Sequence, residues 1–322
     1  MNTTAFREKL KSRQAGTWIR VFAAVVIFIV FTLANFNFVS SGNLKNLLTD
    51  SVPYLVMGIG VTFVLLVGSI DLSIGAVCST ATVIVAVLLP TMGYTSYLVA
   101  LAMGIVAGFI NGLLVVYLKI PSFIATLGSM GAWQTVAYLV SGSSPIQIKK
   151  AQWPMIDWAR SAFGIIPLPF VLALVLLLVF YLVQTKTSFG KNTFAVGVNE
   201  RAAAVAGVNV NRTKLLIFTV CGACAALGGI VLAAKLRSGL PTIGATMNMA
   251  VTAAVVLGGT ALTGGKGGLV QTLIGCFIYN MLLSGLNMVG ITSYYQDIVF
   301  GLLMIAAVYF TVDRSDRHSV VK

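Results

Sequence analysis

The stretch TKTSFGKNTFAVGVNERAAAVAGVNVNRTK, residues 185–214, is the one long polar interruption in the C-terminal half of this chain. Two runs hydrophobic enough to cross a membrane flank it, Pro169 to Val183 and Leu215 to Ala234. Since a helical crossing takes about 20 predominantly apolar residues, the polar stretch must lie outside the bilayer. The fold is therefore expected to be a membrane bundle with a water-exposed segment between two spans.

A short helix is expected inside this stretch, over residues 200–206. Asn199 is a suitable N-cap, Glu200 lies favourably at the positive N-terminal end, and Gly207 supplies a left-handed stop. Isolated helices below roughly 12 residues are marginal in water, so something must hold this one. We expect it to dock into a groove on another protein; the alternative is an ordinary capped helix resting on its own membrane domain. The apolar face of the helix consists of three residues at helical spacing, Ala202, Val205 and Ala206.

The composition as a whole indicates an all-α polytopic membrane protein. Of the 322 residues, 58% are hydrophobic and 9% are charged, and the mean hydropathy is +0.97, too apolar for a soluble globular chain. We expect about ten transmembrane helices, with the short helix between the sixth and the seventh. The expected spans are Thr17–Phe36, Val52–Val67, Leu72–Leu89, Ser96–Leu118, Ser122–Val140, Ile165–Val183, Leu215–Ala234, Asn248–Leu262, Leu269–Val289 and Tyr294–Val312.

The positively charged residues predict how these spans are oriented. The formal net charge is +13, but the basic residues are scattered between apolar runs, which argues against a nucleic-acid partner. With the N-terminus in the cytoplasm, most of the 21 Lys and Arg residues fall on the cytoplasmic side, as the positive-inside rule requires. This orientation predicts a cytoplasmic tail over 1–16, a transmembrane domain over 17–312 with its cytoplasmic loop 185–214, and a cytoplasmic tail over 313–322.

No motif for catalysis or cofactor binding is found in the sequence. Cys221 and Cys224 form a CxxC only formally, and their apolar surroundings favour packing over redox chemistry. The segment LTGGKGG, 262–268, lacks the first glycine and the Ser/Thr of a phosphate-binding loop. We therefore expect no metal, no cofactor and no enzymatic activity in this chain. No span carries the acid–base pair of an ion-driven carrier, and Asp71 is expected to cap the span that follows it.

Uncharged polar side chains within the spans are candidates for the route of a polar solute. Each of them has an alternative role as a hydrogen bond between helices, which is the commoner use of single polar residues in membrane bundles. The Gly-x-x-x-Gly spacing of Gly104, Gly108 and Gly112 indicates close helix packing. The candidate route residues are Asn111, Ser122, Thr126, Gln134, Asn280 and Asn287.

Several longer segments resemble the membrane permease of bacterial ribose-type ABC importers. The likeness runs from about Val52 to Val312, and its segments are AVGVNERAAAVAGVNVNRTK, AVVLGGTALTGGKGGLVQTLIG, GITSYYQD, GSIDLSIG and IPSFIATLG. The resemblance implies a multi-pass subunit of the bacterial cytoplasmic membrane, surrounded by lipid, that pairs with a second permease copy or a paralogue. It also implies two cytoplasmic ATPase domains, which carry the ATP and magnesium, and an external sugar-binding protein.

The resemblance also implies roles for individual residues. In that family an NE-x-AA-x-x-x-G segment couples the permease to the ATPase, and the span that begins IPSFIATLG is expected to line the pore, with Phe123 as a constriction. The implied coupling residues are Asn199, Glu200, Ala202, Ala203 and Gly207, with Arg201 at the open position and Ala206 on the apolar face.

The main hypothesis is a permease subunit that moves a monosaccharide, ribose or a related sugar or polyol, driven by separate ATPase subunits. The alternative is a self-sufficient secondary carrier or channel for a small polar solute, and a third possibility is a membrane scaffold without transport. Flux through this polypeptide alone, without nucleotide, distinguishes the alternative from the main hypothesis.

Overall fold

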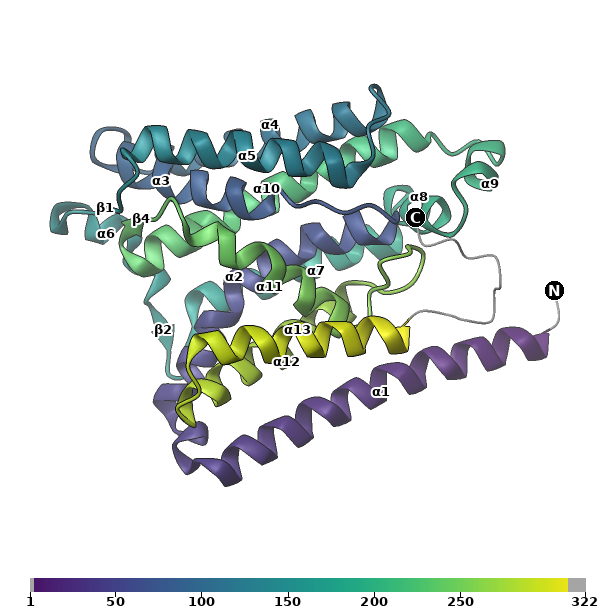
Figure 1. Cartoon of the computed structure of the whole chain (residues 1–322), viewed down its shortest axis with the longest axis horizontal. Coiled ribbons are helices and arrows are strands. Elements are labelled where there is room, and N and C mark those ends of the chain that lie inside the picture. Colours follow the sequence, from purple (N-terminus) through teal and green to yellow (C-terminus); the bar gives the residue numbers. More distant parts are fainter. Residues whose placement is uncertain (1–2, 312–322) are drawn as a thin grey trace.

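The computed structural model describes residues 3–311, and these form an almost entirely helical bundle (Figure 1). Most of the longer helices lie side by side along the long axis of the molecule (Figure 1). The helices, in chain order, are α1 (Thr3–Ala34), η1 (Phe36–Val39), α2 (Ser41–Leu66), α3 (Ile74–Met92), α4 (Thr95–Val116), α5 (Ser122–Ser141), η2 (Lys150–Gln152), α6 (Trp153–Ile156), η3 (Asp157–Ala159), α7 (Leu168–Lys186), α8 (Ser188–Val198), α9 (Glu200–Val205), α10 (Val210–Leu236), α11 (Ile243–Leu257), α12 (Leu269–Met288) and α13 (Ser293–Thr311).

A helix lies at each of the ten places where the sequence predicts a span. Eight of the described helices are long and apolar enough to cross a membrane: α1, α2, α3, α4, α5, α7, α10 and α12. At the eighth place the helix α11 has only 15 residues and ends at Leu257, so the last five residues of the predicted span Asn248–Leu262 are a loop instead. At the tenth place lies α13. The all-α polytopic fold is confirmed.

The second helix begins well before the predicted start of its span. The prediction placed the start at Val52, where the uninterrupted apolar run begins, but α2 starts at Ser41. Ser40 is its N-cap, and the Ser40 side chain accepts a hydrogen bond from the backbone N–H of Asn43 at 3.3 Å. Hydropathy alone does not detect this polar beginning of the helix, residues 41–51. The start is marked by the cap, which is a local backbone signal.

Two interior helices begin inside the bundle rather than at its surface. Between α2 and α3 the chain is not helical over residues 67–73, and most of this segment is buried. Near the starts of α3 and α11 the backbones of Gly75 and Gly244 meet, so that a Cβ on Gly244 would lie 1.7 Å from the carbonyl oxygen of Gly75. Only residues without a side chain allow this approach.

The glycine spacing on α4 marks a close contact, as predicted. Gly104 and Gly108 face Gly222 of α10, and a Cβ on Gly222 would lie 2.2 Å from the carbonyl oxygen of Gly104. Beside this contact, Cys221 and Cys224 are free and buried, with exposed fractions of 1% each. They pack in the core, as the apolar surroundings of the CxxC indicated.

Two small antiparallel sheets lie at the end of the bundle that holds the connections between α5 and α7 and between α10 and α11. In one, β1 (Ile146–Gln147) pairs with β4 (Ser238–Gly239). In the other, β2 (Ala162–Phe163) pairs with β3 (Ile166–Pro167). The first sheet joins segments on either side of α7 and α10, so the long connection after α5 is an ordered structure.

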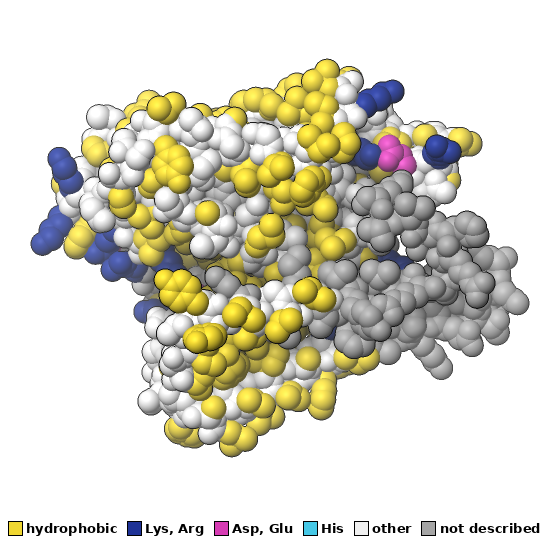
Figure 2. All heavy atoms as spheres, viewed as in Figure 1, with side chains coloured by type: hydrophobic (Ala, Val, Ile, Leu, Met, Phe, Trp, Pro, Cys, Tyr) yellow, Lys and Arg dark blue, Asp and Glu magenta, His cyan; other side chains and the backbone are white. Residues whose placement is uncertain are grey.

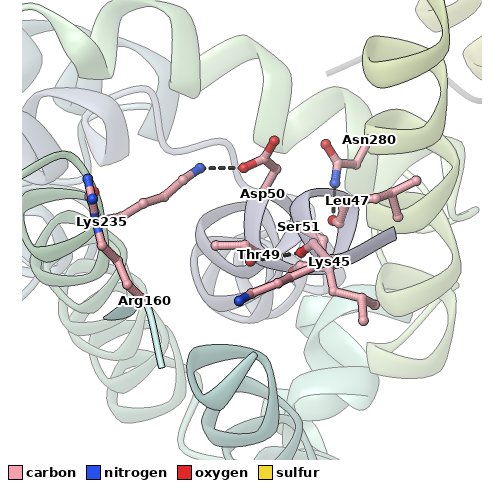
Figure 3. A network of polar contacts seen from close by, with 9 residues as sticks. Lys45, Leu47, Thr49, Asp50, Ser51, Arg160, Lys235 and Asn280 are labelled. Carbon is pink, nitrogen blue, oxygen red and sulfur yellow. Dashed lines mark hydrogen bonds and ion pairs between the residues drawn. The ribbon is translucent and has the colours of Figure 1, made fainter. Parts of the chain in front are cut away.

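Ion pairs strengthen this end of the molecule. The Arg237 guanidinium lies 3.6 Å from the ring centroid of Trp153 and donates to the Asp157 carboxylate at 2.7 Å. Figure 3 shows a second pair, in which the Lys235 ammonium lies 2.5 Å from the Asp50 carboxylate, so that α10 is joined to α2. Arg160 donates to the backbone oxygen of Lys235 at 3.1 Å.

Basic side chains gather at the two ends of the molecule, with a broad hydrophobic band between them (Figure 2). The start of α1 and the end of α13 lie at the same end as α8 and α9 (Figure 1). The predicted tail over 1–16 is not set apart by a helix break, because α1 runs unbroken from Thr3. The predicted tail over 313–322 lies outside the described residues.

Candidate functional site

The short helix in the polar stretch is present with its predicted cap and stop. It is α9, and it ends at Val205, one residue earlier than predicted. The Asn199 side-chain oxygen accepts from the backbone N–H of Ala202 at 3.0 Å, and Gly207 has a φ of +86°. The extended backbone of Asn199 turns the chain sharply between α8 and α9, which makes α9 a separate element.

The outward face of α9 is the predicted apolar face. Val205 is 91% exposed, and Ala202 and Ala206 are exposed as well. Ala203 differs from the expectation, because only 5% of it is exposed and it packs into the hydrophobic core. The Ala203 side chain is therefore not available to a partner, and it anchors the helix.

An ion pair and a backbone turn hold α9 against its own bundle. The Glu200 carboxylate lies 2.6 Å from the Lys214 ammonium on α10, although half of the Glu200 side chain stays exposed. The backbone N–H of Val208 donates to the Ala203 carbonyl at 3.0 Å. Arg201 is exposed. These contacts explain how so short a helix persists: its inner side is docked, and its outer side is free.

The second polar feature is the buried, non-helical segment between α2 and α3. The backbone N–H of Ile70 donates to the Ser122 hydroxyl at 3.1 Å, and the N–H of Leu72 donates to the Thr126 hydroxyl at 3.1 Å. From the other side, the Asn248 amide donates to the Leu72 carbonyl at 2.7 Å. Side chains of α5 and α11 thus replace the backbone partners that a helix would supply, as burial requires.

Asp71 lies within this segment rather than at an exposed helix end. Only 5% of it is exposed. One carboxylate oxygen accepts from the backbone N–H of Ser73 at 2.8 Å and from the Ser73 hydroxyl at 2.6 Å. The Asn111 amide donates to the same hydroxyl at 2.8 Å. The expected capping of α3 by Asp71 is therefore not observed: the carboxylate fixes Ser73, and the start of α3 has no side-chain cap hydrogen bond.

Most of the candidate route residues have partners inside the chain. Asn111 and Thr126 are fully buried, and Asn280 is 1% exposed and donates to the Leu47 carbonyl at 2.5 Å (Figure 3). Ser122 and Gln134 are partly buried, and each has one of the hydrogen bonds that join distant segments. The candidates that reach the surface are Phe123, which is 50% exposed, and Asn287, which accepts from Gln296.

Replacing Thr126 by valine should lower the free energy of unfolding by about 1–3 kcal/mol, because the buried N–H of Leu72 loses its acceptor. Thr135→Val on the same helix is the control: Thr135 is exposed and bonds only within α5, so its loss should stay within about 0.5 kcal/mol. The measurement is reversible unfolding in detergent. Equal losses in the two variants would show that the hydroxyl of Thr126 does not support the segment.

Replacing Asp71 by alanine should cost about 1–3 kcal/mol of stability, since the buried N–H of Ser73 is left without an acceptor. Asp71→Asn keeps an oxygen in the accepting position, so the loss should be below about 1 kcal/mol. The same unfolding titration compares the two. A loss for Asp71→Asn as large as that for Asp71→Ala would mean that the accepting oxygen is not what holds the segment.

Comparison with known proteins places this arrangement in a family. Residues 43–308 match the family model described as the permease component of branched-chain amino acid transport systems. The chain belongs to this permease family. The permease is 35% identical over 287 residues to the ribose import permease protein of Bacillus subtilis strain 168, covering 88% of each chain.

Two relatives from Escherichia coli strain K12 agree with this assignment. The permease is 34% identical over 300 residues to a probable ABC transporter permease protein, which covers 92% of the permease and 90% of the relative. It is 35% identical over 294 residues to the L-arabinose transport system permease protein, covering 88% and 87%. No solved structure matches the chain. The permease is therefore of the ribose type, a subunit of an ABC importer, as the resemblance of its motifs implied.

Sequence reasoning missed two polar residues that organise the permease. Asn248 was assigned only as the start of a span, yet it holds the segment between α2 and α3. Gln184, near the end of α7, accepts from the backbone N–H of Leu269 at 3.2 Å and so fixes the start of α12. An amide at the edge of an apolar run was the available signal in both cases. Within residues 3–311, no group of three His, Cys, Asp or Glu side chains is placed to hold a metal ion.

Proposed function

We propose that the permease imports a monosaccharide, ribose or a related sugar or polyol, and that a separate ATPase drives it by gripping α9. The observation that carries this proposal is the outward face of α9: an apolar, solvent-facing surface built on a helix whose inner side is firmly docked. The sugar is inferred from the relatives that are named for ribose and arabinose.

The glycine-rich loop after α11 supports an energy source outside this chain. In a phosphate-binding loop the glycines free the backbone to surround an anion. Here the loop glycines face protein atoms instead: a Cβ on Gly264 would lie 2.9 Å from the Gly197 carbonyl oxygen, and one on Gly267 would lie 2.5 Å from the backbone of Thr260. The loop is thus a packing element, and ATP and magnesium are assigned to the partner ATPase.

The orientation and the remaining partners follow from the two ends of the molecule. We place α9 and both termini in the cytoplasm of a bacterium, with the permease in the cytoplasmic membrane. The opposite end carries Lys149 and Lys150, both exposed, while its Asp50 and Asp157 are already paired. This basic surface suits an acidic face on an external sugar-binding protein. A second permease copy or a paralogue completes the transporter, with α5 and its exposed Phe123 beside the route.

Reconstituted vesicles test the function. The permease is reconstituted with its partner ATPase and a sugar-binding protein, and uptake of ribose, arabinose and leucine is measured with and without ATP. Uptake of a sugar that requires both ATP and the ATPase supports the proposal. Sugar flux through vesicles that contain the permease alone would favour the self-sufficient carrier or channel, and ATP-driven uptake of leucine alone would overturn the assignment to sugars.

A further inference from the structure

The last residues of α8, directly before α9, are wedged between two other parts of the permease. A Cβ on Gly197 would lie 1.7 Å from the carbonyl oxygen of Leu66, the last residue of α2, and 2.7 Å from the backbone nitrogen of Gly265. The neighbouring Val198 side chain packs against Gly265, whose own Cβ would lie 2.8 Å from a Val198 methyl group. Three segments that are distant in sequence therefore meet backbone to backbone.

A hydrogen bond closes the contact between the other two segments. The backbone N–H of Gly265 donates to the Leu66 carbonyl at 2.9 Å, so the glycine-rich loop and the end of α2 are joined at the atom that Gly197 touches. Gly68 and Gly264 are also in backbone contact. We call this contact of Leu66, Gly68, Gly197, Gly264 and Gly265 the glycine junction.

The rest of α8 packs closely against α2 and α7, so a movement of α8 is expected to push on both helices. The Phe189 ring lies 5.5 Å from the Phe63 ring, centroid to centroid. A Cβ on Gly190 would lie 2.0 Å from the Gln184 carbonyl oxygen at the end of α7. Close-packed contacts of this kind have low compressibility and transmit strain.

Beyond the glycine junction the chain continues into the segment 67–73, which is hydrogen-bonded to α5. Leu66 ends α2, and the buried segment that follows is bound to α5 through the hydroxyls of Ser122 and Thr126. The segment is not helical and is held by side chains, so we expect its hydrogen bonds to change more easily than those of a helix interior. A displacement at the glycine junction thus reaches α5 through covalent chain and two hydrogen bonds.

We propose that Gly197 and Val198 are positioning residues that pass the movement of α9 to α5 through the glycine junction. This inference rests on the proposed role of α9 as the ATPase contact. Gly197 is required there because any side chain would force the junction apart, and Val198 is required because its methyl group is the contact with the glycine-rich loop.

The test follows α5 directly with a thiol probe. Leu127, 44% exposed on α5, is replaced by cysteine in the complete transporter, where the four native cysteines are buried. The rate of labelling by a maleimide is measured with ADP and with ATP plus vanadate, and the ATPase that co-purifies is quantified. In this Leu127→Cys background we expect the labelling rate to change at least threefold between the two nucleotide states.

Val198→Ala should reduce this nucleotide-dependent change by half or more, and Gly197→Ala should abolish it, while the co-purified ATPase stays at the level of the background. The matched controls are Val179→Ala, half exposed on α7, and Gly42→Ala, which has open space around it. Both control variants should keep the full nucleotide-dependent change in the labelling rate. Because 74% of Val198 is exposed, its truncation leaves no internal cavity, so this variant decides the question even if Gly197→Ala does not accumulate.

An unchanged nucleotide response in Val198→Ala would overturn the inference, and so would a background in which labelling does not respond to nucleotide at all. A loss of the co-purified ATPase in Val198→Ala would also overturn it, since Val198 would then contact the ATPase itself. Failure of the proposed function has a different signature: no ATPase co-purifies with the unaltered permease.

Discussion

Val205→Lys should release the ATPase from the permease while leaving the membrane bundle intact. Val205 is the most prominent residue of the outward face of α9, with 91% of it exposed. A lysine there places a charge in the centre of the proposed contact, and losing a central anchor of an interface typically costs about 2 kcal/mol or more, roughly a thirtyfold loss of affinity. Uptake driven by ATP should fall in parallel.

With lysine at position 205, a loss of the ATPase cannot be explained by unfolding of α9. Val205 is the last residue of α9, and a positive charge at a helix C-terminus is favourable, so the helix itself is not weakened. The measurement is the amount of ATPase that co-purifies with the tagged permease. Phe163→Lys is the matched control, because Phe163 is 71% exposed at the opposite end of the molecule and should leave the ATPase bound. Normal co-purification with Val205→Lys would refute the docking role of α9.

Gly244→Ala should strongly destabilise the folded permease, because α3 and α11 can no longer pack closely together. A Cβ at this position would lie 1.7 Å from the Gly75 carbonyl oxygen and 2.8 Å from the Ser79 hydroxyl, so two backbones must separate. Overpacking of a core typically costs about 1–3 kcal/mol and occasionally more, and a clash with backbone falls at the upper end. We expect the apparent melting temperature in detergent to fall sharply and the folded yield to drop.

Gly128→Ala is the control for this substitution. Gly128 lies within α5 and has open space where a Cβ would be, so alanine should be neutral or slightly stabilising, since glycine inside a helix costs up to about 1 kcal/mol. Gly75→Ala should resemble Gly244→Ala, because its Cβ would lie 2.1 Å from the Gly244 carbonyl oxygen. A Gly244→Ala permease with the melting temperature of its parent would contradict the close contact.

The features that the sequence predicted well are local ones. Asn199 and Gly207 act on backbone within a few residues, so the cap and the stop of α9 could be read directly from the chain. The apolar spans are also local in this sense, since length and hydropathy suffice to identify them. The alternation of these spans with one polar loop was enough to predict a bundle with a short separate helix.

The features that were missed depend on contacts between distant segments. Thr126 and Ser122 were candidates for a solute route because a hydroxyl in a span has several uses, and only the fold shows that they hold residues 67–73. The resemblance implied a coupling role for Ala203, but its burial could not be predicted, because it depends on how α9 lies on the core. The break between α2 and α3 was predicted, since the second span ends at Val67 and the third begins at Leu72, but its burial inside the bundle depends on contacts with α5 and α11.

The meeting of α3 and α11 has a consequence for the electrical behaviour of the importer. Each helix start carries about half a positive elementary charge, so two of them near Gly75 and Gly244 amount to about one. Like partial charges repel each other more strongly where water is excluded. Separating the two helix starts would relieve this repulsion, so we expect it to favour a rearrangement of the importer that moves α3 and α11 apart.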